Sequence, residues 1–295
     1  MSASWLIVIA SLLFATMGVC VKLAASQYGS GEIVMYRGLI GALMIGAISH
    51  WRGESLRTAL PAQHFLRSLT GVIALCLWFY AIGTLPLATA MTLNYTSSLW
   101  LALFLLGGAL VLRTQSVDAR LVFAALIGFA GVVLVLRPTI EQDQWWHGLA
   151  GLLSGMVSAT GYLQVAALGR AGEPEGRIVF YFSIGGVLGG AALTALAGWH
   201  EHSWRGIGLL LAVGVLATVA QLMLTRAYAR GRTLTNASLQ YLGIAFSFVY
   251  GVLLFDDGIT TAAVIGMLLI VGAGVWATRL RLPTAGTAGN AANKR

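Results

Sequence analysis

The feature that most constrains this chain is a series of long apolar runs that carry almost no charge. Residues 121–136 and 262–277 are examples, rich in Leu, Val, Ala and Gly. A helix of about 20 such residues crosses the ~30 Å hydrocarbon core of a bilayer, whereas a β-barrel strand would alternate polar and apolar residues. Only 9% of the residues are charged, far below the roughly 25% of a soluble domain. The sequence therefore predicts an all-α integral membrane protein.

Breaks in hydropathy divide the chain into ten predicted transmembrane helices. The loops between them are short, and a final segment is small, polar and predicted to be disordered. The predicted spans lie near residues 4–25, 31–49, 65–84, 87–111, 118–136, 147–168, 177–199, 204–226, 234–255 and 259–279, and the tail is 283–295.

The basic residues are concentrated on one side of the predicted membrane. With the N-terminus placed in the cytoplasm, fourteen of the 18 Lys and Arg fall on the cytoplasmic side, Arg67 among them. Lys22, Arg137 and Arg205 fall outside, and Arg37 lies within the second span. This positive-inside bias predicts that both termini are cytoplasmic in a bacterial-type inner membrane. The net charge of +8 then reflects topology and contact with the lipid bilayer, and no nucleic-acid partner is expected.

The two halves of the chain resemble one another weakly. Residues 80–90 line up with 228–238, each beginning with Tyr-Ala, and Gly131 corresponds to Gly272 if the second copy is slightly shorter. A five-helix unit that is repeated once re-enters the membrane from the opposite side, so the copies have inverted topology, as in many secondary transporters. We therefore predict two five-helix repeats and a cytoplasmic tail, at 1–138, 147–280 and 283–295.

Several local features occur in an order typical of one transporter family. They are Gly18 followed by Lys22, Arg37 in the second helix, the turn from Tyr80-Ala81 to Leu85-Pro86-Leu87-Ala88, and the closing helices around Gly131 and Gly272. On these features the chain resembles the EamA-type, ten-helix branch of the drug/metabolite transporter superfamily over nearly all of residues 4–280. The resemblance implies a central cavity with inward and outward gates, and substrates such as amino acids, amines or carboxylates. The chain departs from the family pattern after the fourth helix, where Arg113 replaces an acidic residue, and at Ser97-Ser98 and Ile244-Ala245, where prolines are common.

Charged side chains are nearly absent from the interiors of the predicted spans. Glu32 lies near a helix entrance, and Asp256 and Asp257 lie at a helix end. Without a deep carboxylate there is no obvious ion relay, which favours facilitated exchange or efflux. Arg37 lies about six residues inside its span, where a permanent guanidinium must face a cavity or polar partners. It is predicted either to bind an anionic group or to be held by backbone carbonyls or Glu32.

Polar and aromatic residues form a stripe on the fourth predicted helix. Met91, Asn94, Tyr95 and Ser98 recur at helical spacing, and the second half presents Asn236, Gln240 and Tyr241. Amides donate and accept hydrogen bonds, which suits the carboxylate and ammonium of an amino acid. Simple interhelical hydrogen bonding is the alternative. The predicted substrate-binding residues are Arg37, Trp78, Asn94, Tyr95, Ser98, Tyr162, Gln221, Gln240 and Tyr241.

Motifs for ATP hydrolysis and for membrane-embedded catalysis are missing. The sequence has no P-loop, nucleophile elbow or HExxH motif. His200-Glu201-His202 is poorly spaced for zinc and is interpreted as a solvated loop, and Cys20 and Cys76 are interpreted as small apolar residues inside spans. We therefore predict no enzyme activity, no metal and no cofactor.

The seventh predicted span contains overlapping pairs of glycines. Gly185, Gly186, Gly189 and Gly190 give small-xxx-small spacing, which permits close approach of another helix. Packing within the chain is favoured, with a homodimer face as the alternative.

These features together predict a secondary, non-ATP transporter of a small organic metabolite. An amino acid or related compound is favoured as the substrate, with flavin, S-adenosylmethionine or a cationic drug as alternatives. The competing function is a membrane-embedded enzyme or lipid-handling protein, which would normally show clustered His, Asp or Glu near an interface.

Overall fold

The computed structural model describes residues 3–111, 144–230, 239–258 and 260–279, together with 120, 123, 126–128, 130, 131, 134 and 236. The described residues form helices and no strand, which confirms the all-α class. The predicted tail lies outside the described residues, as does most of the fifth predicted span. The helices are α1 (Ala3–Ala24), α2 (Ser30–Arg52), α3 (Pro61–Thr84), α4 (Leu87–Tyr95), α5 (Ser97–Val111), α7 (Trp145–Arg170), α8 (Glu175–Ala197), α9 (Trp204–Arg230), α11 (Leu242–Phe255) and α12 (Thr261–Arg279).

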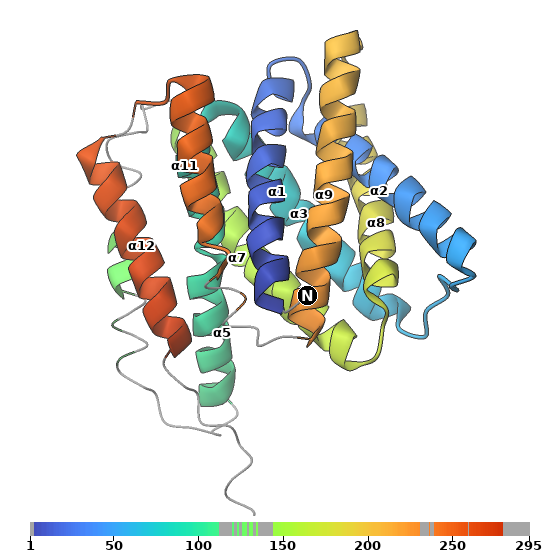
Figure 1. The fold of residues 1–295 in the computed structure, drawn as a ribbon, viewed down its shortest axis with the longest axis horizontal. Helices are drawn as coiled ribbons and strands as arrows, with labels where there is room; N and C mark the ends of the chain where they lie inside the picture. The colour runs from blue at the N-terminus through green and yellow to red at the C-terminus, as the bar shows by residue number, and fades with distance from the viewer. Residues whose placement is uncertain are drawn as a thin grey trace, which may run out of the picture.

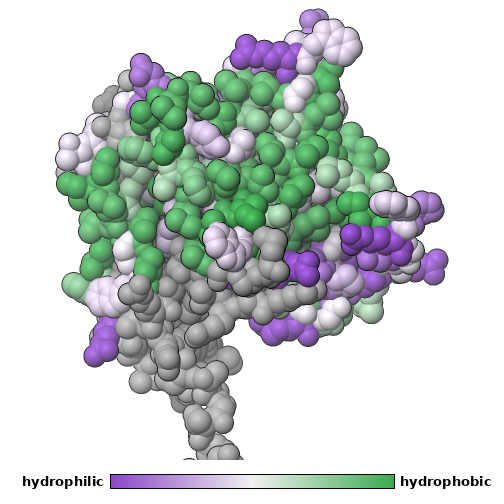
Figure 2. Space-filling view, in the orientation of Figure 1, coloured by the Kyte–Doolittle hydropathy of each residue, from purple (hydrophilic) through white to green (hydrophobic). Residues whose placement is uncertain are grey.

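Six of these helices are long and apolar enough to cross a membrane, namely α1, α2, α3, α7, α8 and α9. The face of the bundle in Figure 2 is largely apolar, with hydrophilic residues gathered toward its edges. Leucines such as Leu43, Leu188 and Leu253 are well exposed. A surface of this kind is stable when it faces lipid tails and not water.

Helices from the first half of the chain pack against helices from the second half. The most extended contacts pair α2 with α8, α1 with α9 and α3 with α7. In addition α1 packs against α11, while α7 packs against α4 and α5. In Figure 1, α1 stands between α9 and α11, and α2 and α8 lie together at one side of the bundle. The pairing therefore arranges helices from both halves around a common centre.

Glycines hold α2 and α8 at close range. A Cβ added to Gly190 would lie 2.5 Å from the Met35 nitrogen, and one added to Gly38 would lie 2.6 Å from the Ser183 carbonyl oxygen. Gly185 faces α3 instead, where an added Cβ would lie 2.6 Å from Cβ of Ser68. This is the packing within the chain that the glycine spacing predicts.

The predicted fourth span, 87–111, has the outer bounds of α4 and α5, but it is interrupted at Thr96. The Thr96 hydroxyl donates to the Leu93 carbonyl oxygen at 2.6 Å, and such back-bonding competes with the regular helix ladder. The backbone of α7 also approaches closely here, since an added Cβ on Gly155 would lie 2.5 Å from the Thr96 hydroxyl. A second turn precedes α11, where Gly243 N–H donates to the Gln240 carbonyl at 2.9 Å.

The third helix begins earlier than the sequence pattern predicts. α3 starts at Pro61, a residue suited to the first helical turn because its missing N–H is not needed there. Arg67 therefore lies within the helix and not at its boundary, and only 5% of its surface is exposed. The sequence pattern places Arg67 among the basic residues on the cytoplasmic side, whereas its side chain is buried inside the bundle.

Candidate substrate-binding site

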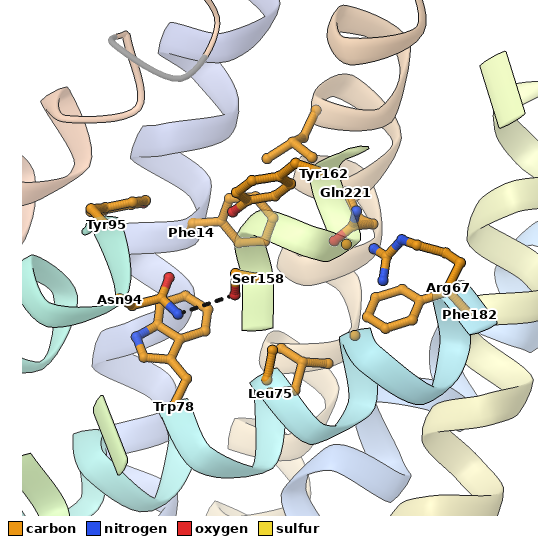
Figure 3. A pocket seen from close by; sticks show the side chains of 14 residues that line it. Phe14, Arg67, Leu75, Trp78, Asn94, Tyr95, Ser158, Tyr162, Phe182 and Gln221 are labelled. Atoms are coloured by element: carbon orange, nitrogen blue, oxygen red, sulfur yellow. Dashed lines mark hydrogen bonds between the residues drawn. The ribbon is translucent and has the colours of Figure 1, made fainter. Parts of the chain in front are cut away.

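A cavity of about 60 Å³ lies at the centre of the bundle. Residues from six helices line it (Figure 3). Typical small-molecule sites measure about 300–1,000 Å³, so the side chains are drawn together around the centre in this conformation. The lining residues are Phe14 of α1; Arg67, Gly71, Ala74, Leu75 and Trp78 of α3; Asn94 and Tyr95 of α4; Ser158, Gly161 and Tyr162 of α7; Phe182 of α8; and Gln221 and Leu224 of α9.

Among the described residues, Arg67 is the one charged residue that directly lines this cavity. Its Cζ atom lies 4.1 Å from the centroid of the Phe182 ring, and Figure 3 shows the guanidinium between this ring and Gln221. The space for it comes from two glycines, because a Cβ on Gly71 would collide with the guanidinium and one on Gly161 would lie 3.6 Å from it. These glycines were not predicted as part of the site.

Arg37 lies behind the same aromatic ring. Its Cζ atom is 5.0 Å from the Phe182 centroid, and it donates a long hydrogen bond of 3.5 Å to the Gln221 side-chain oxygen. Only 4% of Arg37 is exposed. Glu32, the carboxylate considered as its partner, is bonded to histidines instead. Arg37 thus borders the cavity through Gln221 and Phe182.

The side of the cavity facing α4 is polar and aromatic. Asn94 donates to the Ser154 hydroxyl at 2.9 Å and more weakly to Ser158 at 3.5 Å. Trp78 is buried against Phe14, with ring centroids 6.5 Å apart, and its indole nitrogen has no hydrogen-bond partner among the described residues. The site therefore offers the Asn94 amide, the Ser158 hydroxyl and the free Trp78 N–H within an apolar wall.

A layer of buried residues adjoins the cavity wall at Tyr162. Tyr162 stacks on Tyr228 with centroids 4.9 Å apart, and Gln240 is buried beside it. Tyr241 is also buried, and its neighbour is Ser98. The fold therefore brings Trp78, Asn94, Tyr95, Tyr162 and Gln221 to the cavity wall and Arg37 and Gln240 next to it, while Ser98 and Tyr241 neighbour one another and are not among the lining residues.

One end of the α2–α8 pair is tied by what we call the Glu32 cluster, which comprises Glu32, His200, His202, Gln27 and Ser203. The buried Glu32 carboxylate lies 2.9 Å from Nδ1 of His200 and 3.8 Å from Nε2 of His202. Ser203 donates to the Gln27 side chain at 2.9 Å. The loop interpreted from sequence as solvated therefore covers the start of α2.

The opposite end is tied by what we call the Glu173 cluster, which comprises Glu173, Thr58, His64 and Arg177. The Glu173 carboxylate accepts from Thr58 at 2.8 Å and from Arg177 at 3.1 Å, and it lies 3.2 Å from the His64 ring. These contacts join the loop after α2 to the loop before α8. Each end of the α2–α8 pair is thus tied by a buried carboxylate that contacts at least one histidine.

A larger cavity of about 670 Å³ lies at the Glu173 end, where Arg52, Arg177 and Arg226 are among its lining residues. Within the described part of the chain, it shares no lining residue with the central cavity.

The Glu173 cluster should make stability depend on pH in the acid range. Burial acts to raise the pKa of Glu173, but hydrogen bonds from Thr58, His64 and Arg177 and the Arg177 charge outweigh it and hold the pKa below the ordinary 4.5. A carboxyl with a lowered folded-state pKa contributes stability above its unfolded pKa and loses it as the pH falls through the folded one.

We expect Glu173→Gln to cost about 1–3 kcal/mol at neutral pH, because charge-assisted hydrogen bonds are lost. Thermal unfolding of the purified protein and of the variant should be measured from neutral pH downward. The difference between their Tm values should narrow below pH 4.5. A Tm difference that stays constant through this range would show that the ionised Glu173 carboxylate does not stabilise the cluster.

A third contact links α1 to the start of α4. Lys22 donates to the Leu85 carbonyl at 2.9 Å and lies 3.4 Å from the Asp257 carboxylate, while Asp257 also accepts from the Leu87 N–H at 2.9 Å. A carboxylate at a helix N-terminus stabilises the first turn. Lys22 is thus tied to the protein instead of extending freely to water.

Comparison with known proteins assigns the chain to a family. Residues 1–137 match the model of the EamA-like transporter family. A pseudopaline exporter of Pseudomonas aeruginosa is 30% identical over 281 residues, which cover 94% of this chain and 95% of the exporter. The protein belongs to the EamA-like transporter family. The superfamily resemblance inferred from the sequence is therefore confirmed, and the chain is a multi-pass membrane protein of this transporter family.

Other EamA-like relatives carry different substrate names. A riboflavin transporter of Rhizobium johnstonii is 26% identical, covering 76% of this chain and 72% of the relative. An S-adenosylmethionine uptake transporter of Rickettsia bellii is 21% identical, covering 85% and 84%. One crystal structure shares the fold with a TM-score of 0.69 and 22% identity, covering 94% of this chain and 98% of that one. Because the named substrates differ, membership of the family does not select one.

Proposed function

We propose that this protein is a secondary transporter that moves a small organic metabolite, an amino acid or related compound, across an inner membrane by alternating access. The observation that carries the proposal is the central cavity, which is lined by helices from both halves of the chain and lies between two clusters that tie opposite ends of the bundle. Transport by relatives of high coverage favours this function over a membrane-embedded enzyme.

The proposed architecture has two inverted five-helix repeats, 1–138 and 147–280, with both termini and the tail 283–295 in the cytoplasm. The packing of the helices supports it. If α1, α2 and α3 correspond to α7, α8 and α9, the α1–α9 contact corresponds to the α7–α3 contact, and the α2–α8 contact corresponds to itself. A two-fold axis in the membrane plane would pass through the α2–α8 pair, as in other inverted-repeat transporters.

The two clusters are the proposed gates. The Glu32 and Glu173 clusters tie the ends of the α2–α8 pair, and the central cavity has little free volume in this conformation. Opening one cluster while the other stays closed would expose the centre to one side at a time. The proposed substrate-binding residues are the predicted set, with Asn94, Trp78 and Arg37 as the principal polar contacts.

A cysteine at Ser158 tests whether the centre is reached from both sides. Ser158 lines the cavity, and the substitution is nearly isosteric. With Cys20 and Cys76 replaced by alanine, we expect a membrane-impermeant maleimide to modify Ser158→Cys from either face of oriented vesicles.

Two exposed positions at opposite ends of the bundle serve as controls, Ser55→Cys and Glu201→Cys. Each should react from one face only, which also establishes the orientation of the chain. Modification of Ser158→Cys from a single face, or from neither, in a folded protein would contradict alternating access at this site.

A further inference from the structure

Two buried cations adjoin the central cavity. The Arg37 and Arg67 guanidiniums contact one aromatic ring, with Cζ atoms 5.0 Å and 4.1 Å from the Phe182 centroid. Both residues are almost fully buried. Their separation therefore cannot exceed the sum of those two distances, and their charges repel one another.

No carboxylate among the described residues forms an ion pair with either guanidinium. Glu32 is bonded to His200, Glu173 to Arg177 and Asp257 to Lys22. The Nε atoms of Arg37 and Arg67 also lack hydrogen-bond partners within the described part of the chain. The Gln221 side chain and the Phe182 ring are the contacts that partly offset these charges.

Such an arrangement is costly in the empty protein. A buried guanidinium loses its hydration, and the face of one aromatic ring restores only a small part of it. Two like charges beside the same ring increase the cost. An anionic ligand would offset this free-energy cost, since a carboxylate can accept two parallel hydrogen bonds from the planar guanidinium.

We propose that the substrate carries at least two carboxylates, one recognised by Arg67 in the cavity and the other by Arg37 behind Gln221. This inference rests on the proposed transport function and narrows its substrate class to dicarboxylic amino acids and similar polycarboxylate metabolites. A neutral zwitterion supplies one carboxylate together with an ammonium, so it leaves one guanidinium unpaired and adds a like charge.

The rest of the cavity fits such a compound. Trp78 and Leu75 supply an apolar wall for the carbon chain, and the Asn94 amide and Ser158 hydroxyl lie on the side away from Arg67 (Figure 3). Movement of the Gln221 side chain would open the way from the cavity to Arg37, because Gln221 lies at the cavity wall and is bonded to Arg37.

Matched pairs of compounds test the number of carboxylates. Proteoliposomes would be loaded with glutamate, aspartate, succinate or glutarate, or with the monoamide of each, and counterflow of the same labelled compound measured. We expect at least one dicarboxylate to exchange about tenfold faster than its monoamide, since one charge-assisted pair is lost in the amide. Equal or faster exchange of the monoamides would overturn the dicarboxylate proposal while leaving transport intact.

Substitution of Arg67 tests whether its charge serves the substrate or the fold. Arg67→Gln should reduce dicarboxylate exchange about tenfold or more, and Arg67→Lys, which keeps the charge but loses the fork, should give an intermediate loss. Arg205→Gln removes an exposed arginine at the start of α9 and should leave exchange unchanged.

Thermal unfolding without added compound separates the two roles. Because Arg67→Gln removes a like-charge repulsion, the empty variant should be at least as stable as the natural protein, but glutamate or succinate should no longer raise its Tm. A large fall in the Tm of the empty variant would mean that Arg67 is structural and would overturn the proposal. No exchange of any compound, including neutral amino acids, amines and flavin, would overturn the proposed function itself.

Discussion

Gly190→Ala is expected to destabilise the protein severely, although the same substitution in most helices is favourable. The added Cβ would lie 2.5 Å from the Met35 nitrogen and 2.6 Å from the Gly31 carbonyl oxygen. Both are backbone atoms that cannot rotate away, so α2 and α8 must separate. We expect a cost of about 1–3 kcal/mol from overpacking, and an even larger cost for Gly190→Leu, which should yield little folded protein.

Gly208→Ala is the matched control for this experiment. Gly208 also lies within a helix, α9, but an added Cβ would have no neighbour within 4 Å. Replacement of an unconstrained helical glycine by alanine stabilises by about 0.5–1 kcal/mol. Thermal unfolding in detergent should therefore shift in opposite directions for the two alanine variants. A Gly190→Ala protein as stable as Gly208→Ala would show that α2 and α8 are not in close contact.

Asn94→Ala is expected to abolish most of the exchange activity without unfolding the protein. The Asn94 amide is buried at the cavity wall, where it donates to Ser154 on α7. A buried, oriented amide contributes to substrate binding through hydrogen bonds that alanine cannot replace, so we expect a loss of about tenfold or more in exchange rate. Counterflow in proteoliposomes measures it, with size-exclusion chromatography as the check on folding.

Ser154→Ala distinguishes substrate binding from helix packing. It removes the acceptor that Asn94 uses in this conformation but leaves the amide in place for the substrate. Its exchange rate should stay close to that of the natural protein. If the two variants lose equal activity, the amide acts through the contact between α4 and α7 alone.

Much of the fold could be predicted from the sequence because a helix that crosses the bilayer must consist of a long run of mainly apolar residues. The apolar runs located the long helices, and the small-xxx-small glycines of residues 185–190 indicated a close contact that α2 and α3 provide. Two residues of the predicted stripe, Asn94 and Tyr95, line the central cavity, whereas Met91 and Ser98 are not among its lining residues. These predictions succeed because each depends on periodicity within a single helix.

The features that were missed depend on contacts between distant segments. Arg67 was counted on the cytoplasmic side because a basic residue near the end of an apolar run normally lies there, and its place in the cavity wall was missed. Pro61, with its preference for the first helical turn, was the local signal that the helix starts earlier. The pairing of Glu32 with His200 and of Glu173 with Thr58 joins loops far apart in sequence, which no local pattern reveals.

Counterflow exchange by the natural protein in sealed proteoliposomes, without ATP, tests the central claim most directly. The assay would cover amino acids, dicarboxylates, amines, flavin and S-adenosylmethionine, with protein-free liposomes as the blank. We predict rapid accumulation of a labelled dicarboxylic compound against an internal pool of the same compound, and its loss in Asn94→Ala. Folded, reconstituted protein that exchanges no compound above the blank would contradict the assignment of a transport site to the centre of this bundle.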